Sequence, residues 1–224
     1  MKETIVLSTS GLGKQVSSPE GQLTILDDVN LAVHEGETVA LVGPSGAGKT
    51  TLLALLAGLD RPSHGEVRLC DENLELLDED GRAIVRGRYV GFVFQSFHLM
   101  ASLTALENVM LPLELAEAPD ASKRARVALA SVGLETRTGH YPRQLSGGEK
   151  QRVAIARAFV TKPKILFADE PTGNLDTASG EKISRLLFEM NKDFGTTLVL
   201  VTHDMPLAGQ CDRVLKIDAG RLVE

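Results

Sequence analysis

The stretch that decides the fold begins with Thr38-Val39-Ala40-Leu41-Val42 and continues as Gly43-Pro44-Ser45-Gly46-Ala47-Gly48-Lys49-Thr50-Thr51-Leu52-Leu53-Ala54-Leu55-Leu56-Ala57-Gly58. The first five residues form a short apolar, β-rich run, which predicts a buried strand, and residues 51–58 predict an apolar helix. Between them, residues 43–50 match the phosphate-loop pattern G-x-x-x-x-G-K-[ST]. A strand, a glycine-rich loop and a helix in this order predict a site for nucleotide phosphates.

The residue types of this loop explain how it would hold a triphosphate. Glycines at 43, 46 and 48 allow a sharp turn that aims backbone N–H groups at phosphate oxygens, and the helix start adds partial positive charge. Lys49 would reach the β- and γ-phosphates, and the Thr50 hydroxyl would ligate Mg²⁺. The alternative is a turn that binds nothing, against which the flanking strand and helix argue. The candidate nucleotide contacts are Gly43, Pro44, Ser45, Gly46, Ala47, Gly48, Lys49, Thr50 and Thr51.

Composition limits the class of protein. The chain has 224 residues, 24% charged and 43% hydrophobic, as in an ordinary globular protein with one core. Its net charge of −6 argues against nucleic acid as a partner. The densest basic stretch, residues 123–126, is interpreted as a solvated helix face. Cys70 and Cys211 lack metal-type spacing, so inert buried thiols in a reducing compartment are expected.

The location of the protein follows from what the sequence lacks. No apolar run approaches the roughly 18 residues of a membrane span, and the N-terminus lacks a signal-peptide core. We therefore expect a cytoplasmic protein whose membrane role, if any, depends on a partner.

Strand and helix patterns alternate along much of the chain, which predicts an α/β fold with a mostly parallel core sheet and an antiparallel β region near the N-terminus. The expected strands are 5–7, 31–33, 38–42, 65–69, 89–94, 165–168 and 197–201. The expected helices are 51–58, 78–88, 104–113 with a break at Pro112, 121–132 with Gly133 as its stop, 147–159, and 177–191 with Asp176 as N-cap. Residues 97–160 read as a helical subdomain inserted into one α/β domain that spans 1–224.

Four polar residues follow predicted strands. Gln95 follows the strand 89–94, and Asp169 and Glu170 end an apolar run, where the first acid would hold the metal and the second would orient or deprotonate water. Paired acids also serve as simple caps. His203 follows the strand 197–201 at the same sheet end, which favours a γ-phosphate contact over a structural role. The other histidines, at positions 34, 64, 98 and 140, are interpreted as surface or packing residues.

Several motifs, in this order, resemble those of ABC transporter ATPase subunits, and the resemblance covers essentially the whole chain. They are the Walker A loop at 43–50, Gln95, the signature Leu-Ser-Gly-Gly-Glu at 145–149, the Walker B strand at 165–170, the D-loop at 173–176 and His203. Residues 90–95, 103–109 and 167–176 are similar to the group of lipoprotein-release, macrolide-export and cell-division ATPases (LolD, MacB and FtsE types), and within it to the YbbA type.

The resemblance implies a role for each matched residue. Ser146, Gly147 and Gly148 would contact the γ-phosphate of ATP held by a second subunit, and Asp176 would bridge the dimer interface. Glu170 would be the general base, and His203 would position the γ-phosphate. Gln95 would sense Mg²⁺ and water, so Thr50, Gln95 and Asp169 are the expected metal contacts.

One departure from the family concerns the adenine. Related ATPases often stack the base on an aromatic residue near the N-terminus, whereas this chain has no Phe, Tyr or Trp before Tyr89 and places Val16 there. Base–aromatic stacking is worth ~1–3 kcal/mol, so weak base selectivity is expected.

The resulting hypothesis is an ATPase subunit that forms a homodimer on ATP and drives a separate integral membrane permease from the cytoplasmic face. Export or extraction of a lipophilic or envelope substrate is the expected task. The first alternative is mechanical signalling across the membrane without transport, as in cell-division ATPases. A second, a soluble ABC protein of DNA repair or translation, is disfavoured by the single ATPase unit, the absence of a coiled-coil insertion and the acidic charge.

Overall fold

The computed structural model describes residues 4–18 and 21–223. The chain forms two compact units. The first contains residues up to Val90 and from Thr197 onward, and the second contains Gly91–Thr196.

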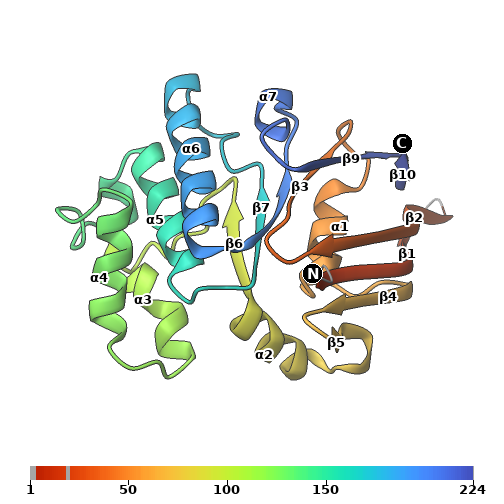
Figure 1. Ribbon diagram of the computed structural model, residues 1–224, viewed down its shortest axis with the longest axis horizontal. Coiled ribbons are helices and arrows are strands. Elements are labelled where there is room, and N and C mark those ends of the chain that lie inside the picture. Colours follow the sequence, from red (N-terminus) through yellow and green to blue (C-terminus); the bar gives the residue numbers. More distant parts are fainter. Residues whose placement is uncertain (1–3, 19–20, 224) are drawn as a thin grey trace. The chain divides into compact units, whose positions relative to one another are not determined.

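The first unit contains two sheets. The antiparallel sheet has the order β2-β1-β4-β5, and in the other sheet β3 lies between β9 and β8, with β10 beyond β9 (Figure 1). The strands are β1 (Ile5–Ser18), β2 (Gly21–His34), β3 (Thr38–Val42), β4 (His64–Leu69), β5 (Glu72–Asn73), β8 (Thr197–Val201), β9 (Arg213–Asp218) and β10 (Arg221–Val223). The helices are α1 (Lys49–Leu56), the 3₁₀ helix η1 (Leu74–Leu76), α2 (Glu79–Tyr89) and α7 (Met205–Ala208).

Strand β3 is an inner strand of its sheet, between β9 and β8. It pairs in parallel with β8 and with β9, so that Leu41 lies opposite Val201 on one side and Leu215 on the other. All five residues of β3 and all five of β8 are buried, as expected for strands covered on both faces. Helix α1 buries four leucines after it leaves the phosphate loop, and each contributes about 1.5–3 kcal/mol of stability.

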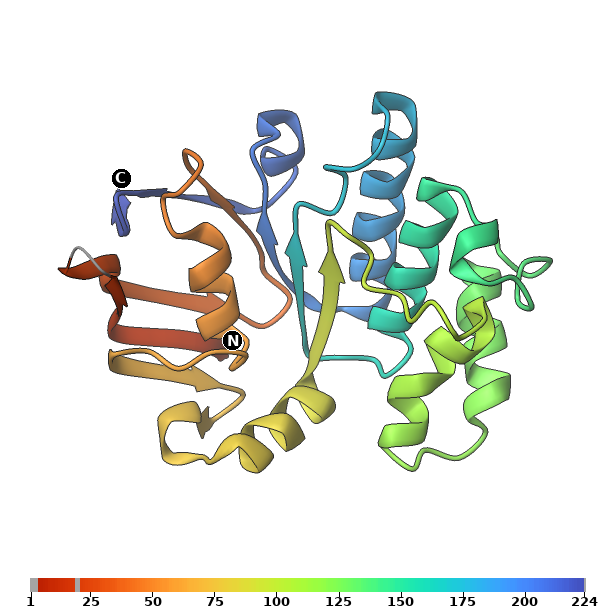
Figure 2. The same ribbon diagram turned by 180° about the vertical axis from the view of Figure 1, so that it is seen from behind.

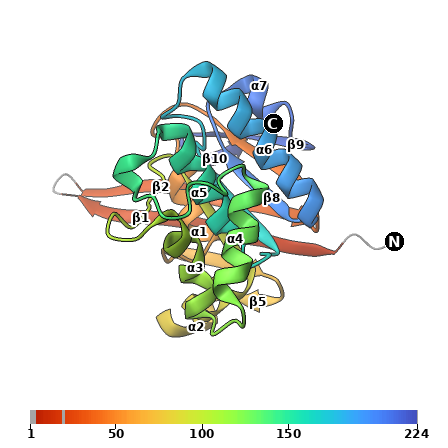
Figure 3. The ribbon, with the colours of Figure 1, turned by 90° about the vertical axis from the view of Figure 1, so that its left-hand side faces the viewer.

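The second unit is mainly helical. Helices α3, α4 and α5 contact one another (Figure 3), and β7 is the neighbour of β6 in the sheet. Its elements are β6 (Val90–Phe94, of which Val90 ends the first unit), α3 (Ala105–Leu115), α4 (Ala121–Ser131), the 3₁₀ helix η2 (Pro142–Gln144), α5 (Gly147–Phe159), β7 (Ile165–Asp169) and α6 (Thr177–Phe194).

Many predicted elements are confirmed, and with them the α/β class. Strands β3 and β8 and helix α5 have the predicted bounds. Gly133 follows α4 with φ +69°, a left-handed conformation that suits glycine. Asp176 caps α6 by accepting a hydrogen bond from the Ser179 N–H at 3.0 Å. Every regular element between residues 97 and 160 is helical, while the inserted-subdomain organisation stays a prediction.

The predicted break at Pro112 is wrong, because α3 continues through this residue to Leu115. A proline in a helix interior costs about 3 kcal/mol through its missing N–H and its clash with the preceding turn. Val109 and Leu113 on the same helix are 0% and 1% exposed. Their burial contributes about 1.5–3 kcal/mol each, which offsets the penalty.

Other predicted bounds also need correction. Strands β1 and β2 are each 14 residues long, whereas only residues 5–7 and 31–33 were predicted as strand. The two strands pair with each other beyond their apolar residues, and this pairing determines their length. Helix α1 begins at Lys49 instead of Thr51, since the Leu52 N–H already donates to Gly48 O at 2.8 Å. Tyr89 ends α2 and is not part of a strand.

Neither cysteine is fully buried, contrary to the prediction, since both have intermediate exposure. Burial of the Cys211 thiol, with Asp212 next to it, nevertheless raises its pKa to about 11. A thiol with so high a pKa is poorly reactive at neutral pH, so the inertness of Cys211 stays a prediction that does not depend on complete burial.

Candidate nucleotide-binding site

The phosphate loop connects β3 to α1 in the first unit, and its backbone requires glycine. Gly43, Gly46 and Gly48 have φ of +156°, +79° and +101°, a region that side-chain-bearing residues rarely adopt. A Cβ on Gly43 would lie 2.1 Å from Ile217 O, and one on Gly48 would lie 3.0 Å from Ile25 O. The loop is therefore pressed between β9 and β2 at positions where only glycine fits.

The start of α1 is open to an anion. Its N-cap residue, Gly48, has no side chain that could accept hydrogen bonds from the first turn, and no acid occupies that turn. The Lys49 ammonium bends back over the loop and donates to Gly43 O and Pro44 O, both at 2.9 Å. Helix N–H groups and a loop-bound ammonium fit the phosphates of a nucleotide, and the exposed Thr50 hydroxyl is a hard oxygen donor of the kind Mg²⁺ prefers.

His203 follows β8, one of the two strands that pair with β3 in the first unit. Leu41 and Val201 lie opposite each other in the parallel strands β3 and β8. Gly43 comes two residues after Leu41 and His203 two residues after Val201, so both lie at the same edge of the sheet. The Thr202 N–H donates to Leu41 O at 3.3 Å, which keeps the two strand ends together. The exposed imidazole of His203 thus belongs to the phosphate-loop end of the sheet, as predicted.

In the second unit, Gln95 contacts the D-loop. The Gln95 amide Nε2 donates to Asn174 Oδ1 at 3.3 Å, and Asn174 Nδ2 donates to Gln95 O at 2.9 Å. A Cβ on Gly173 would lie 2.8 Å from Gln95 Nε2, so a larger residue at 173 would displace the glutamine. The contact of Asn174 with Gln95 was not predicted, because the two residues lie 79 positions apart in the sequence.

The paired acids lie at the end of β7, the neighbour of β6. Figure 2 shows the arrows of β6 and β7 pointing the same way, so Gln95 and Asp169 lie at corresponding strand ends. Asp169 is the last residue of β7 and is half-buried. Glu170 has φ +46°, a conformation that costs about 1–3 kcal/mol for a residue other than glycine and that concentrates at functional sites. The backbone outlier at Glu170 was not visible in the sequence.

The signature stretch forms the N-terminus of α5 through a capping box. The Ser146 N–H donates to Glu149 Oε2 at 2.8 Å, and the Glu149 N–H donates to Ser146 Oγ at 3.2 Å. The Ser146 hydroxyl accepts in this bond, which leaves its own hydrogen for another acceptor. Hydrogen bonding from the Ser146 backbone lowers the pKa of Glu149. Arg137 Nε also donates to Glu149 Oε1 at 3.0 Å, so the carboxylate is held from two sides.

The signature and the D-loop both line a surface cavity of about 330 Å³ within this unit. Its lining residues are Ser146, Gly147, Gly148, Arg152, Asn174, Leu175, Asp176, Ser179, Lys182 and Ile183. Two cationic side chains and a glycine-rich helix start suit an anionic ligand. Asp176 is the acid among them, and hydrogen bonding from Ser179 lowers its pKa, so it is ionised at neutral pH.

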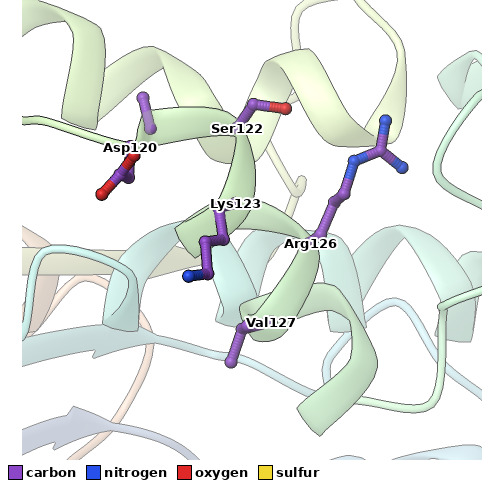
Figure 4. A pocket seen from close by; sticks show the side chains of 6 residues that line it. Asp120, Ser122, Lys123, Arg126 and Val127 are labelled. Atoms are coloured by element: carbon purple, nitrogen blue, oxygen red, sulfur yellow. The ribbon is translucent and has the colours of Figure 1, made fainter.

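A more open hollow of about 590 Å³ lies at the start of α4 (Figure 4). It is lined by Asp120, Ala121, Ser122, Lys123, Arg126 and Val127, and none of the predicted site residues belongs to it. Lys123 and Arg126 are exposed, as the prediction of a solvated basic face requires. Arg124 differs, since it is half-buried and donates to Val160 O at 3.1 Å.

The position expected to face adenine is aliphatic. Val16 lies in β1, is half-buried and pairs with Leu23 of β2. Leu23 is 56% exposed. Neither side chain offers an aromatic face to a base.

Within residues 4–18 and 21–223, no helix has both the length and the apolar character needed to cross a membrane.

The chain is similar to several known proteins. Residues 26–173 match the family model described as ABC transporter. The chain is 53% identical over 221 residues to the ABC transporter ATP-binding protein YbbA of Escherichia coli (strain K12), covering 98% of this chain and 97% of the relative. It is 47% identical over 226 residues to the lipoprotein-releasing system ATP-binding protein LolD of Pseudomonas syringae pv. tomato (strain ATCC BAA-871 / DC3000), covering 100% of both.

Solved structures are similar over nearly the full length as well. The dimeric structure of a post-hydrolysis state of the ATP-binding cassette MJ0796, bound to ADP and Pi, has a TM-score of 0.90 and 40% sequence identity, and 97% of each chain is covered. A second dimeric structure of MJ0796, a bacterial ABC transporter cassette, gives the same TM-score at 41% identity and 97% coverage of each chain.

Proposed function

We propose a function from one premise: the chain belongs to the ABC transporter family, as an ATP-binding subunit. Proteins of this family are ATPases, and the chain is an ATPase. We infer that it forms a homodimer on ATP and that ATP hydrolysis drives an integral membrane permease, to which the chain binds from the cytoplasmic face.

The observation that carries this proposal is the division of phosphate-binding features between two places. The phosphate loop with its open helix start lies in the first unit, whereas the second unit holds another anion-suited cavity at Ser146–Gly148. A chain with one of each suits a head-to-tail dimer in which the signature of one chain contacts the γ-phosphate bound by the other. The dimeric structure of MJ0796 bound to ADP and Pi supports the formation of a dimer.

The proposed chemistry uses oxygen donors and one base. Thr50, Asp169 and Gln95 would supply a hydroxyl, a carboxylate and an amide oxygen, which are the oxygen donors that Mg²⁺ prefers. The ion would neutralise charge on the phosphates. Glu170 would accept a proton from the attacking water. His203 would donate a hydrogen bond to the γ-phosphate. When the nucleotide binds, the Lys49 ammonium would donate its hydrogen bonds to phosphate oxygens instead of to the two loop carbonyls.

The proposed permease contact is the loop after β6 together with the start of α3. Asn108 is fully buried and holds this loop through four hydrogen bonds, to Met100 N (2.8 Å) and to the carbonyls of Met100 (3.1 Å), Leu103 (3.0 Å) and Thr104 (2.9 Å). Met100 is 48% exposed on it. An exposed apolar side chain on a loop held by hydrogen bonds suits a protein contact. The name of the LolD relative, a lipoprotein-releasing system protein, supports a lipophilic or envelope substrate.

The permease proposal is tested by co-purification from the cells that naturally produce the protein. We expect affinity-tagged wild-type chain, extracted with a mild detergent, to carry an integral membrane protein with it. Met100→Glu should reduce recovery of that protein about tenfold, because burying an unpaired carboxylate opposes the contact by more than 1.4 kcal/mol. Val127→Glu is the matched control, since Val127 is 64% exposed on α4. Equal recovery with all three proteins would contradict the proposed contact surface, and recovery of no membrane protein would contradict a permease partner.

Base selectivity provides a separate prediction. With Val16 and Leu23 in place of an aromatic face, we expect the affinities for ATP and GTP to differ by less than about 100-fold, or ~2.7 kcal/mol. Equilibrium binding of both nucleotides at equal Mg²⁺ measures this ratio. Val16→Tyr should strengthen binding of both purines, and Ile5→Tyr near the other end of β1 serves as the control. A larger preference for ATP in the wild type would show that another group selects the base.

A further inference from the structure

The turn that follows Gln95 has an unusual backbone. Phe97 and His98 have φ of +59° and +46°, so two consecutive residues other than glycine adopt the left-handed conformation. Such residues persist only where their surroundings hold them. The aromatic rings of Phe94 and His98 also meet edge to face, with centroids 4.8 Å apart. Hydrogen bonds from three side chains hold this turn and the residues before it.

Arg157 of α5 supplies the main contact. Its NH2 group donates to Phe97 O at 2.9 Å and its NH1 group donates to His98 O at 2.6 Å, although these residues are about sixty positions away in the sequence. The Arg157 side chain is half-buried, and this burial lowers its pKa. A rigid planar fork can satisfy two adjacent carbonyls at once, which a lysine ammonium does less well.

Two other side chains hold the preceding carbonyls of the same segment. Gln151, also on α5 and fully buried, donates a long hydrogen bond of 3.5 Å to Phe94 O and one of 2.6 Å to Pro171 O. Asn174 donates to Gln95 O at 2.9 Å. The carbonyls of residues 94, 95, 97 and 98 therefore all receive hydrogen bonds from side chains, and α5 carries two of the three donors.

We propose that Arg157 is a positioning residue that fixes the left-handed turn at Phe97 and His98 and thereby the Gln95 amide. This proposal rests on the proposed role of Gln95 as a Mg²⁺ and water contact. Because α5 begins at the signature residues, Arg157 ties the position of Gln95 to that of the signature helix. A displacement of this helix when the signature binds phosphate would then be passed to Gln95 and to the loop proposed to contact the permease.

The test compares Arg157→Lys with the wild-type full-length protein. The lysine keeps the charge but loses the fork, so we expect kcat for ATP hydrolysis to fall about tenfold and the half-saturating Mg²⁺ concentration to rise about tenfold, as for other partners that orient a ligand. The KM for ATP should change little, because Lys49 and the phosphate loop are untouched. Arg185→Lys on the exposed face of α6 is the matched control.

A second-site variant separates positioning from simple stability. Glycine adopts positive φ without a side-chain penalty, so Arg157→Lys combined with His98→Gly should recover most of the kcat and Mg²⁺ dependence of His98→Gly alone. A purely structural Arg157 would give no such recovery, and that result would overturn the proposal. Unchanged Mg²⁺ dependence in Arg157→Lys would also overturn it.

Gln95→Ala distinguishes this inference from the proposed function. Full hydrolysis with normal Mg²⁺ dependence in Gln95→Ala would contradict the role of Gln95 itself, and the proposal for Arg157 would fall with it. Loss of activity in Gln95→Ala together with wild-type behaviour of Arg157→Lys would contradict the inference alone.

Discussion

Glu170→Gln is expected to bind ATP about as tightly as the wild type and to hydrolyse it about 10²- to 10⁴-fold more slowly. Glutamine has nearly the same shape but cannot accept the proton of the attacking water, and general-base catalysis contributes a factor of this size. The phosphate loop, which supplies most of the expected affinity, lies in the other unit of the fold and is unchanged. Equilibrium binding of ATP and single-turnover hydrolysis measure the two quantities separately.

The same variant should accumulate as an ATP-bound dimer. Slow hydrolysis leaves the γ-phosphate in place, and this phosphate is the group through which the signature of a second chain is proposed to bind. Light scattering after gel filtration with ATP and Mg²⁺ should give twice the mass found without nucleotide. Glu181→Gln, an exposed acid on α6, is the control. Wild-type turnover in Glu170→Gln would exclude this residue as the base.

Lys49→Ala and Ser146→Arg should each inactivate a homodimer, whereas a heterodimer of the two should recover activity. Lys49→Ala removes a cation from the phosphates of its own chain, and Ser146→Arg fills the cavity offered to the other chain. Removing a single group that stabilises the transition state lowers kcat by about 10²- to 10³-fold. In the heterodimer both defects fall in one shared site, and the other site is intact. Differently tagged chains allow the heterodimer to be purified and its ATPase rate measured.

The complementation experiment has two checks. Ser122→Arg adds the same charge at an exposed position on α4 and should leave the homodimer active. Cysteines introduced for Ser45 and Gly147 should crosslink between chains when ATP is present. A Cβ at Gly147 would lie 3.3 Å from Leu175 Cδ2, the end of a side chain that can shift slightly. A heterodimer no more active than either homodimer, or crosslinks formed only within one chain, would contradict shared sites.

Local rules explain which elements were predictable from sequence. The start of α5 is predictable because Ser146 and Glu149 form a capping box, which depends on residues three positions apart. The strand at 38–42 and the start of the loop could be read because a short buried apolar run stops at Gly43. Asp176 and Gly133 mark a helix start and a helix end for the same kind of reason.

Contacts between distant residues explain what was missed. Pro112 indicated a helix break, yet the buried residues Val109 and Leu113 keep α3 continuous. Strands β9 and β10 were not expected, because β9 is specified by its pairing with β3 about 170 residues earlier. The hydrogen bonds of Asn174 with Gln95 join residues 79 positions apart, and nothing in either local sequence indicates the other.

By itself, the sequence determined the phosphate loop, the order of the motifs and the family. These features depend on local requirements, so the residue types alone indicate them. The requirements are glycine at positive φ, a lysine and a hydroxyl at a fixed spacing, and helix caps. Only the tertiary structure decided that Gly43 is pressed against Ile217, that Glu170 has a left-handed backbone and that Arg157 holds the turn after Gln95. Each of these depends on packing between segments distant in the chain, where burial and hydrogen bonding outweigh local preference.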